Sequence, residues 1–387
     1  MYDRSFPAVG KTPEGVAFSK TAQGLFLERL VLTEFRNYAQ VTLSLPEKTP
    51  QVVLTGPNGA GKTNLLEAVS LLTAGKGLRQ ARLGDLARKG DIVNAQWAVA
   101  ARVRRAFDAL EIGTGRAADG TEKRTLRVNG ENASQTALAR QMPMVWLTPA
   151  MDRLFSGDPA GRRRFLDRLA QCFDDKHAGH CIAYARAFKQ WRRLVDDGVK
   201  DESWFSALET SMASCGEKID KARRRTIDIL NGFLNVDDGV FPRTVLSLDN
   251  VPTEQLASLF KAARRAQTAP AGIHQTALNA LNVDKNMPAA LCSTGEQKAM
   301  LIAVLTAHLK AQADKTGTLP LLLLDEAAAH LDSRRLEAFT DSLTRLKTQV
   351  WLTGTNPEAF TALKRTAYFC AVPVLIDGRR DLDAAAS

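Results

Sequence analysis

The chain lacks the features of a membrane or secreted protein. None of its apolar runs reaches the ~18–20 residues that a membrane-spanning helix needs. Residues 1–24 contain no apolar core of a signal peptide, so we expect a flexible polar leader there. The five cysteines are an odd number and form no C-x-x-C pair, which argues against a disulfide framework and favours a reducing compartment. The sequence therefore predicts a cytoplasmic protein with no membrane partner.

The chain also lacks repeats of 20–50 residues and sustained heptads, which argues against a solenoid and a long coiled coil. Positive charge, by contrast, is in excess: 52 Lys and Arg against 42 Asp and Glu give a net charge of +10 over 387 residues. Such a surface suits a polyanionic partner, either nucleic acid or an acidic membrane surface. With 45% hydrophobic residues, the chain can bury one large or two ordinary domains.

A strand–loop–helix passage at 51–72 matches a phosphate-binding loop. A β-rich run at 51–55 precedes GPNGAGKT, which fits G-x-x-x-x-G-K-[ST], and apolar residues then recur at helical spacing. Backbone N–H groups of such a loop close around phosphates, and the helix N-terminus adds positive potential. We predict that Lys62 reaches the β- and γ-phosphates of ATP and that Thr63 binds Mg²⁺; the alternative is an ordinary glycine-rich turn. The predicted nucleotide-binding residues are Gly56, Pro57, Asn58, Gly59, Ala60, Gly61, Lys62 and Thr63.

A second carboxylate-bearing strand is expected to complete the magnesium site. In LPLLLLDE at 319–326, the unbroken apolar run Leu321–Leu324 suits a strand buried on both faces, and it ends in Asp325 and Glu326. We assign Asp325 to Mg²⁺ and Glu326 to general-base catalysis on the attacking water. The alternative is a plain strand end in which Asp325 caps the following helix.

The stretch CSTGEQKAM at 292–300 begins a further helix. Ser293 and Glu296 fit an S-x-x-E capping box, but capping explains neither Gly295 nor Gln297. One nucleotide needs only one phosphate-binding helix end, and the chain has that end at Gly61–Thr63. We therefore predict that this second end binds the γ-phosphate held by another copy of the chain. The residues assigned to it are Ser293, Thr294, Gly295, Glu296 and Gln297.

STGEQK resembles the signature motif of ABC-type ATPases, whose usual form is close to LSGGQ. In that superfamily the signature of one subunit closes over the ATP of its partner, and Asp332 in HLD resembles the D-loop that follows. Within the superfamily the chain is similar to the RecF family. The matching stretches are FRNY at 35–38, GKGLRQAR at 75–82, LTPAMDRLFSGDPAGRRRFLDRL at 147–169 and YARAFKQWRRLV at 184–195.

The RecF resemblance implies an ABC-type head, α/β in class, with a mostly helical insertion. It implies an ATP- and Mg²⁺-dependent ATPase of DNA repair and replication, linked to the SOS response, that dimerises on ATP. By resemblance, the dimer clamps gapped DNA or single-strand/double-strand junctions and works with RecO and RecR to load the RecA recombinase. The same resemblance places Arg36 and Asn37 near the base or sugar, although a β-turn role is an open alternative.

Two departures from the ABC pattern predict weak, slow hydrolysis. A clear Q-loop glutamine is missing; Gln141 is the nearest candidate, and LTPAMD can occupy that place instead. The switch histidine is also missing, and QVWLTGT at 349–355 offers Thr353 or Thr355 there. These departures suit an ATP-driven switch better than a motor.

The domain organisation is expected to be that of a split ATPase. We predict a leader at 1–24, an N-terminal ATPase part at 25–150, a helical insertion at 151–274 and a C-terminal ATPase part at 275–387. Segments 240–255 and 266–279 contain Pro- and Gly-marked breaks.

Two further sets of residues leave alternatives open. Arginine clusters at 102–105, 162–164, 186–193, 223–225 and 264–265 suit contacts to DNA phosphates, but each could equally be a solvated helix face. CFDDKHAGHC at 172–181 carries four possible zinc ligands, yet in a helix Cys172 and Cys181 would point in opposite directions.

An ABC-type subunit of a transporter or translation factor is the alternative function for the whole chain, followed by a small-molecule kinase. The long insertion and the missing histidine speak against the first, and the kinase leaves STGEQ unexplained.

Overall fold

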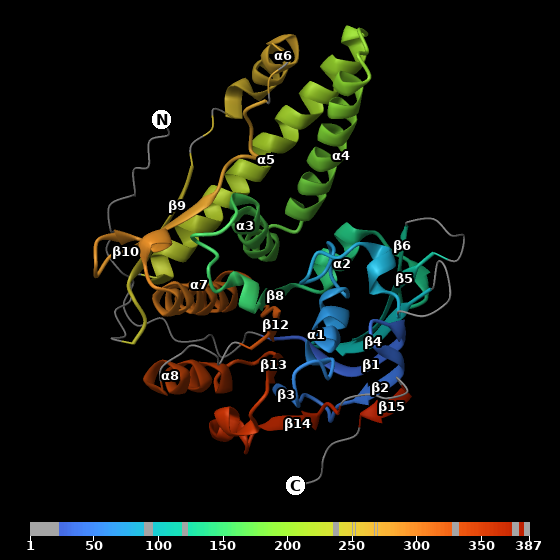
Figure 1. Cartoon of the computed structure of the whole chain (residues 1–387), viewed down its shortest axis with the longest axis vertical. Helices are drawn as coiled ribbons and strands as arrows, with labels where there is room; N and C mark the ends of the chain where they lie inside the picture. Colours follow the sequence, from blue (N-terminus) through green and yellow to red (C-terminus); the bar gives the residue numbers. More distant parts are fainter. Residues whose placement is uncertain are drawn as a thin grey trace. The chain divides into compact units, whose positions relative to one another are not determined.

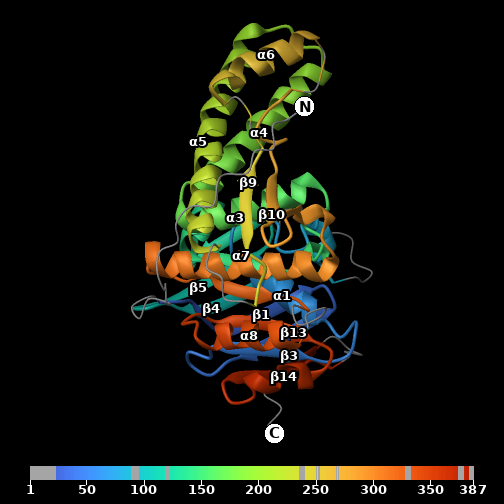
Figure 2. The same cartoon turned by 90° about the vertical axis from the view of Figure 1, so that its left-hand side faces the viewer.

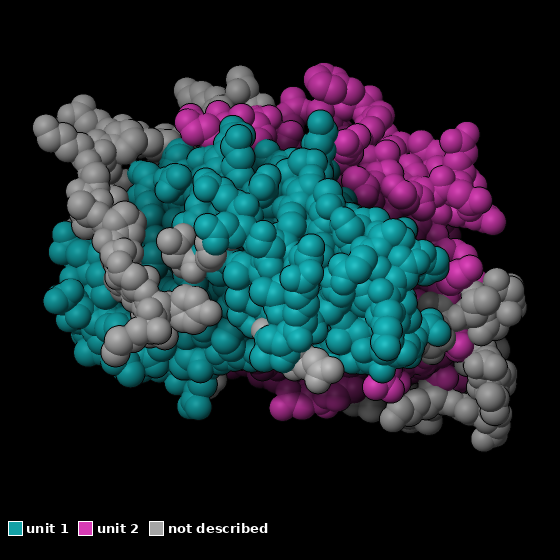
Figure 3. Space-filling model, turned by 90° about the horizontal axis from the view of Figure 1, so that it is seen from above, with its two compact units in different colours: residues 1–16, 152–311 teal, residues 17–151, 312–387 magenta. Residues whose placement is uncertain are grey.

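The computed structural model describes residues 23–88, 96–117, 123–234, 240–249, 251, 253–266, 268, 270–326, 333–373 and 379–382. These residues form two compact units, coloured separately in Figure 3: residues 152–311 in one, and the described residues from 23 to 151 and from 312 to 382 in the other. The leader expected at 1–24 lies almost entirely outside the described residues, as does Asp332. The unit formed by the described residues from 23 to 151 and from 312 to 382 carries the phosphate-binding loop, and we call it the nucleotide unit. The other unit, 152–311, we call the helical unit.

The nucleotide unit contains two sheets. A five-stranded sheet has the order β14-β3-β13-β12-β8, and all four of its strand pairs are parallel. Strands β3, β8, β12 and β13 are largely buried, mainly apolar runs, as expected for a sheet covered on both faces, whereas the edge strand β14 is mostly half-buried. They span Gln51–Thr55 (β3), Met144–Leu147 (β8), Leu321–Leu324 (β12), Val350–Gly354 (β13) and Ala367–Ala371 (β14).

The second sheet has seven strands in the order β15-β2-β1-β4-β5-β6-β7. Most of its strands alternate buried and exposed side chains, the pattern of a sheet with one face on the core. They span Phe26–Phe35 (β1), Tyr38–Ser44 (β2), Ala98–Arg104 (β4), Ala109–Arg116 (β5), Arg124–Val128 (β6), Glu131–Asn132 (β7) and Arg379–Leu382 (β15).

Helix α1 (Lys62–Ser70) lies between the two sheets, contacting β1 on one side and β13 on the other (Figure 1). One hydrophobic core joins residues of both sheets with Leu65, Leu66 and Val69 of α1. Gln349 links the sheets by polar bonds: its amide accepts from Leu27 N at 2.9 Å and donates to Thr49 O at 3.1 Å. The other helices of this unit are α2 (Gln135–Gln141), α8 (Ser333–Thr344) and the short η1 (Leu83–Leu86), η2 (Pro149–Met151) and η5 (Pro357–Leu363).

The helical unit is built on an antiparallel pair of long helices. Helix α4 (His177–Asp196) lies beside α5 (Glu202–Leu234), and α6 (Leu256–Ala266) packs against α5 near its start (Figures 1 and 2). Their core is aromatic and includes Tyr184, Trp191, Phe205 and Phe260. The remaining elements are α3 (Pro159–Phe173), η3 (Thr253–Gln255), η4 (Ala289–Leu291) and α7 (Thr294–Lys315), whose last four residues belong to the nucleotide unit.

A small sheet in the helical unit was not expected from the sequence. Strand β10 (Leu278–Asn282) pairs antiparallel with β9 (Thr244–Leu248) and with β11 (Met287–Pro288). Strand β9 falls within the segment 240–255, and β10 begins in 266–279, both of which the Pro and Gly residues marked as breaks. The prolines lie outside β9, so they bound the strand without interrupting it.

Candidate nucleotide-binding site

The predicted phosphate-binding loop follows β3 and leads into α1, at the carboxyl edge of the parallel sheet. Gly56, Gly59 and Gly61 adopt φ angles of 147°, 80° and 109°, which a residue with a Cβ rarely adopts. Gly61 is also the N-cap of α1, and a Cβ there would lie 2.4 Å from the Tyr38 hydroxyl. The backbone of the loop therefore depends on glycine for two reasons, conformation and space.

Lys62 is held against its own loop. Its ammonium donates to Gly56 O at 2.7 Å and to Pro57 O at 2.9 Å, and its side chain is almost fully buried. No carboxylate of the described residues pairs with it, so an incoming anion meets no competing negative charge at the ammonium. The loop carbonyls thus satisfy its hydrogen bonds and hold the ammonium at the pocket in which phosphate oxygens would lie.

Asp325, at the end of β12, accepts hydrogen bonds from two hydroxyl groups. Thr63 donates to Asp325 Oδ1 at 3.0 Å, and Thr353, at the end of β13, donates to the same oxygen at 2.8 Å. Asp325 is 5% exposed. A carboxylate and a threonine hydroxyl in contact, beside a lysine, are the donor set that Mg²⁺ takes in phosphate-binding loops. The residues present therefore fit a magnesium ion, with Thr63 and Asp325 holding it.

Glu326 lines the same pocket as the loop. Its backbone N–H donates to Thr353 Oγ1 at 2.9 Å, and its φ of 50° is unusual for a non-glycine residue. This constrained backbone directs Glu326 into the pocket. The lining residues of the pocket are Asn58, Gly59, Gly61, Lys62, Thr63, Asn64, Arg79 and Glu326.

Arg36 and Asn37 form the two-residue turn between β1 and β2, and neither is among the lining residues of the pocket. Arg36 donates to both carboxylate oxygens of the buried Glu67, at 2.8 and 2.7 Å. Asn37 donates to the loop carbonyl of Ala60 at 3.2 Å and accepts from Asn64. The β-turn role is therefore found, and Asn37 contacts the loop. A contact of Arg36 or Asn37 with the base or sugar stays a prediction.

Two lining residues, Asn64 and Arg79, were not predicted. Arg79 donates to Asn64 Oδ1 at 2.6 Å and to Glu67 Oε2 at 3.2 Å. Arg79 lies in the GKGLRQAR stretch that carried the family resemblance, which is the signal by which it could have been found. Arg79 lines the pocket while it is ion-paired with the buried Glu67.

The order of the parallel strands also bears on the two positions at which the sequence departs from the ABC pattern, the Q-loop glutamine and the switch histidine. Gln141 precedes β8, so it lies at the amino edge of the sheet, opposite the loop. Thr148 directly follows β8, and Asp325 N donates to Leu147 O at 2.9 Å. The LTPAMD stretch thus begins at the carboxyl edge of the sheet, and its place as the Q-loop stays a prediction. Thr353, not the exposed Thr355, contacts Asp325 at the switch position.

The STGEQ segment forms the start of α7 in the helical unit, and its capping box is present. Ser293 N and Oγ both donate to Glu296 Oε2 at 2.9 Å, and Glu296 N–H points back to Ser293 Oγ at 3.4 Å. Lys285 beside Glu296 and the bonds from Ser293 lower the pKa of that carboxyl to about 2. Glu296 is thus occupied in ordering the helix end.

Gln297 also has a local role that the sequence did not show. It is 4% exposed, donates to Cys292 O at 2.9 Å and accepts from Ser156 Oγ at 3.3 Å. Thr294 accepts from Arg153 Nε at 3.3 Å, whereas Ser293 is exposed. Of the five predicted residues, Ser293 is the exposed one, and its hydroxyl is hydrogen-bonded to Glu296.

The possible zinc ligands at 172–181 do not come together as a set of four. His177 and Cys181 lie near Asp167 instead, with His177 Nε2 2.9 Å from Asp167 Oδ1 and 3.4 Å from Cys181 Sγ. The buried Arg223 donates to both oxygens of Asp167, at 2.8 and 2.9 Å. Burial alone would raise the pKa of Asp167, but Arg223 and His177 hold it below its usual range. This cluster is an ion pair of the helical unit's core, since Arg223 neutralises the carboxylate.

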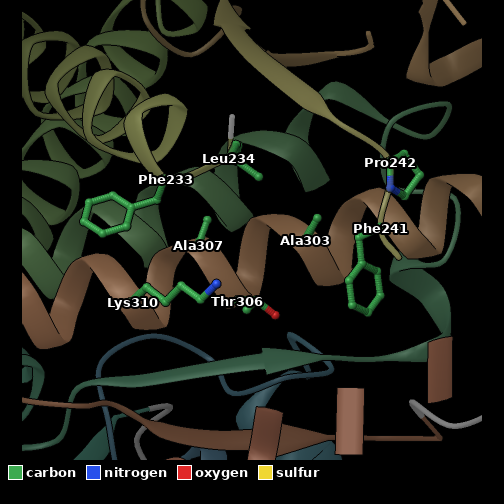
Figure 4. A pocket seen from close by; sticks show the side chains of 8 residues that line it. All are labelled: Phe233, Leu234, Phe241, Pro242, Ala303, Thr306, Ala307 and Lys310. Atoms are coloured by element: carbon green, nitrogen blue, oxygen red, sulfur yellow. The ribbon is translucent and has the colours of Figure 1, made fainter. Parts of the chain in front are cut away.

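A second pocket lies in the helical unit beside α7 (Figure 4). Ala303, Thr306, Ala307 and Lys310 of α7 face Phe233 and Leu234 at the end of α5, and Phe241 and Pro242. Its lining is mainly apolar, with Thr306 and Lys310 as polar members. The charged groups needed for a nucleotide are gathered in the nucleotide unit, so that pocket is the candidate site.

Comparison with known proteins agrees with this geometry. The family described as "RecF/RecN/SMC N terminal domain" matches residues 26–371. The DNA replication and repair protein RecF of Mesorhizobium japonicum is 40% identical over 366 residues, which cover 89% of this chain and 96% of that protein. RecF of Rhizobium meliloti is 41% identical over 370 residues, covering 90% and 97% of the two chains.

Solved structures show the same fold. The recombination mediator protein RecF with ATP, described as part of the RecFOR pathway, superposes with a TM-score of 0.76 at 20% identity, over 94% of this chain and 99% of that one. An Smc head domain from Pyrococcus furiosus gives a TM-score of 0.53 at 19% identity, over 94% and 96%. The predicted fold, an α/β ABC-type ATPase head with a mostly helical subdomain, is confirmed. No helix among the described residues is long and apolar enough to cross a membrane.

Proposed function

Because the chain belongs to the RecF family of DNA replication and repair proteins, we propose that it acts in DNA repair and replication as an ATP-binding, ATP-hydrolysing protein. The observation that carries the ATPase part is the convergence of Lys62, Thr63, Asp325 and Glu326 at one edge of the parallel sheet. This role implies that the protein interacts with DNA and acts in the cytoplasm.

Each residue of the site has a proposed task. Residues 56–63 bind the phosphates, with Lys62 moving its ammonium from the loop carbonyls to the β- and γ-phosphates. Thr63 and Asp325 hold Mg²⁺, which when bound neutralises the phosphate charge that grows during hydrolysis. Glu326 accepts the proton of the attacking water. Thr353 orients both carboxylate residues through its two hydrogen bonds.

We further propose that two chains pair on ATP. The support is that the exposed Ser293 and the backbone N–H groups of Thr294 and Gly295 begin a long helix, which favours a phosphate. Glu296 and Gln297 shape that end from within, and Asp332 acts as the D-loop by resemblance. The dimer would clamp gapped or junction DNA and, with RecO and RecR, load RecA. Slow hydrolysis is expected because a threonine stands at the switch position.

The domain arrangement proposed from the sequence, a helical insertion at 151–274 within a split ATPase, remains a proposal. It agrees with the two compact units at the first boundary, after residue 151, whereas those units place α7 and the signature with the helical elements up to 311.

Light scattering on the Glu326→Gln variant tests the proposal. With Mg-ATP the variant should shift from 42.2 kDa to twice that mass, because ATP binds but is not hydrolysed. Adding Ser293→Arg to the same chain should keep ATP bound and leave the mass at one chain. A single-chain mass with ATP bound, both alone and with gapped DNA, would remove the inter-subunit role of Ser293.

A further inference from the structure

The basic clusters of the chain differ in whether carboxylates neutralise them. Six of the arginines in these clusters are paired with carboxylates: Arg102 and Arg104 with Glu28, Arg105 with Asp108, Arg223 with Asp167, Arg224 with Asp220, and Arg264 with Glu202 and Glu209. Arg162 and Arg163 donate to backbone carbonyls. These side chains serve the fold, and they are poor candidates for contacts to a polyanion. Arg164, Arg225 and Arg265 are exposed and make no salt bridge among the described residues, but each is a single cation beside arginines that are paired or bound to carbonyls.

Helix α4 differs from these clusters because it carries several such cations in one run. From His177 to Val195 its sequence contains no Asp or Glu. Arg186, Lys189 and Arg192 are exposed and make no ion pair or hydrogen bond within the described part of the chain. Arg193 is also exposed and has a surface partner, Asp197, at 3.5 Å, a kind of pair that contributes little. We call these four residues the α4 face.

The packing of α4 fixes which way this face points. Tyr184, Ala187 and Trp191 are buried in the aromatic core, and Trp191 Nε1 donates to Glu209 Oε1 at 3.1 Å. At 100° per residue, the four cations therefore occupy the side of α4 turned away from that core. Figures 1 and 2 show α5 beside α4. By helical spacing, the cations form one stripe on the side of α4 opposite Tyr184, Ala187 and Trp191.

The stripe has the dimensions of a phosphate-backbone contact. Arg186 and Arg193 are seven residues apart, which is about 10 Å along a helix. Duplex DNA carries about one charge per 1.7 Å of its axis, so a segment of that length presents roughly six phosphate charges. Four cations without an interposed carboxylate can therefore each meet a phosphate.

The composition of the face favours duplex DNA over single-stranded DNA. Binding of single strands relies on exposed aromatic rings for base stacking, but Tyr184 and Trp191 of α4 are buried, and the exposed Trp204 belongs to α5. A protein interface relies on apolar or aromatic anchors, whereas the exposed residues from 183 to 193 are Ala, Gln and the four cations.

We propose that the α4 face binds the sugar-phosphate backbone of double-stranded DNA, without reading its sequence. The assignment rests on the proposed function, since it says where that DNA is held. It makes α4 an electrostatic contact whose strength falls as salt rises.

Helix α5 supplies a matched control. Lys218, Lys221 and Arg225 are exposed at a similar helical spacing, but the exposed Glu217 and Asp228 flank them. Removing these three cations changes the net charge of the protein by the same amount as removing three from the α4 face.

The experiment measures fluorescence anisotropy of a labelled duplex of about 30 base pairs between about 50 and 300 mM KCl, with the full chain and Mg-ATP. In the variant Arg186→Gln, Lys189→Gln, Arg192→Gln, affinity should fall at least tenfold. The slope of log K against log salt should shrink by about 2 to 3, because each lost phosphate contact removes about 0.9. Arg186→Lys with Arg192→Lys should restore most of the slope, and the α5 triple variant should keep it.

The outcomes separate the two proposals. If the unaltered chain ignores duplex DNA over the whole salt range, the proposed function fails and the α4 assignment with it. If the unaltered chain binds and the α4 variant keeps both affinity and slope, the assignment alone is overturned. An equal loss in the α5 control would also overturn it, since a general charge effect would then account for the binding. Thermal unfolding at an unchanged temperature verifies that the variants are folded.

Discussion

Replacing Thr353 with valine tests whether the end of β13 controls the reacting groups. The Thr353 hydroxyl is buried and makes two bonds: it donates to Asp325 Oδ1 at 2.8 Å and accepts from Glu326 N–H at 2.9 Å. Valine keeps the shape of threonine but can make neither bond. The two residues assigned to magnesium and to water activation would both lose a support in one substitution.

The cost in stability follows from these two bonds. A hydrogen bond to a charged group contributes about 1.5–3 kcal/mol, and the neutral bond about 1 kcal/mol. The extra methyl group of valine returns about 0.8 kcal/mol in burial. The free energy of unfolding should therefore fall by about 2–3 kcal/mol. Because Glu326 also sits at a φ of 50°, which costs about 1–2 kcal/mol in an L-residue, loss of its N–H bond should let its backbone relax away from the pocket.

Hydrolysis should therefore suffer more than binding. We expect the ATP turnover rate of Thr353→Val to fall tenfold or more, while the ATP dissociation constant changes only a few-fold, since Lys62 and the loop are untouched. Urea unfolding, steady-state phosphate release and fluorescent ATP binding measure the three quantities. Thr355→Val is the control, because this threonine is exposed two residues away. Unchanged turnover in Thr353→Val, or an equal loss in Thr355→Val, would refute the reasoning.

Three more predictions concern the loop and the buried helix α7. Lys62→Ala should weaken ATP binding tenfold or more in a direct binding assay, because its ammonium is the charge held at the loop; unchanged affinity would contradict this role. Gly61→Ala should abolish ATP binding, because its Cβ would lie 2.4 Å from the Tyr38 hydroxyl, whereas Gly75→Ala, also at positive φ but with open space, should cost only about 1–2 kcal/mol of stability and keep affinity. His308 is fully buried, and burial lowers its pKa to about 3. As the pH falls below about 6.5, the imidazole takes up a proton in the unfolded chain but not in the folded one. The free energy of unfolding therefore decreases between about pH 6.5 and pH 3. From pH 7 to 5 this one group should remove about 2 kcal/mol, and His308→Leu should unfold in urea with a correspondingly flatter pH dependence; an identical dependence would show that His308 is not the cause.

The nucleotide pocket could be predicted from the sequence because its parts are local. The strand at 51–55 and the run at 321–324 have the predicted extents, since unbroken apolar segments ending in polar residues mark buried parallel strands. The Thr63–Asp325 contact follows from the motifs themselves. The resemblance to the RecF family then predicted that the segments between these two motifs belong to the same ATPase head and its helical insertion.

Other features depend on partners far away in the chain. Gln297 looked like a phosphate ligand, but its amide is used by Cys292 and Ser156, a contact that no spacing reveals. The sequence also does not show that the guanidinium of Arg36 pairs with the buried Glu67. Likewise, strand β9 was obscured by the prolines that bound it. For Gln297 and β9 the local sequence pattern allowed two interpretations, and contacts with distant parts of the chain distinguish them.

The strand order of the parallel sheet also has a consequence for biosynthesis. Strand β3, which leads into the phosphate-binding loop, has β13 and β14 as its two neighbours, and these begin at Val350 and Ala367. The ribosome therefore makes roughly 300 further residues before β3 can pair, which takes about 15–60 s at 5–20 residues per second. The helical unit is complete at residue 311, so it can fold while the loop is still waiting. A nascent chain truncated before residue 350 should thus contain a folded helical unit but no ATP site.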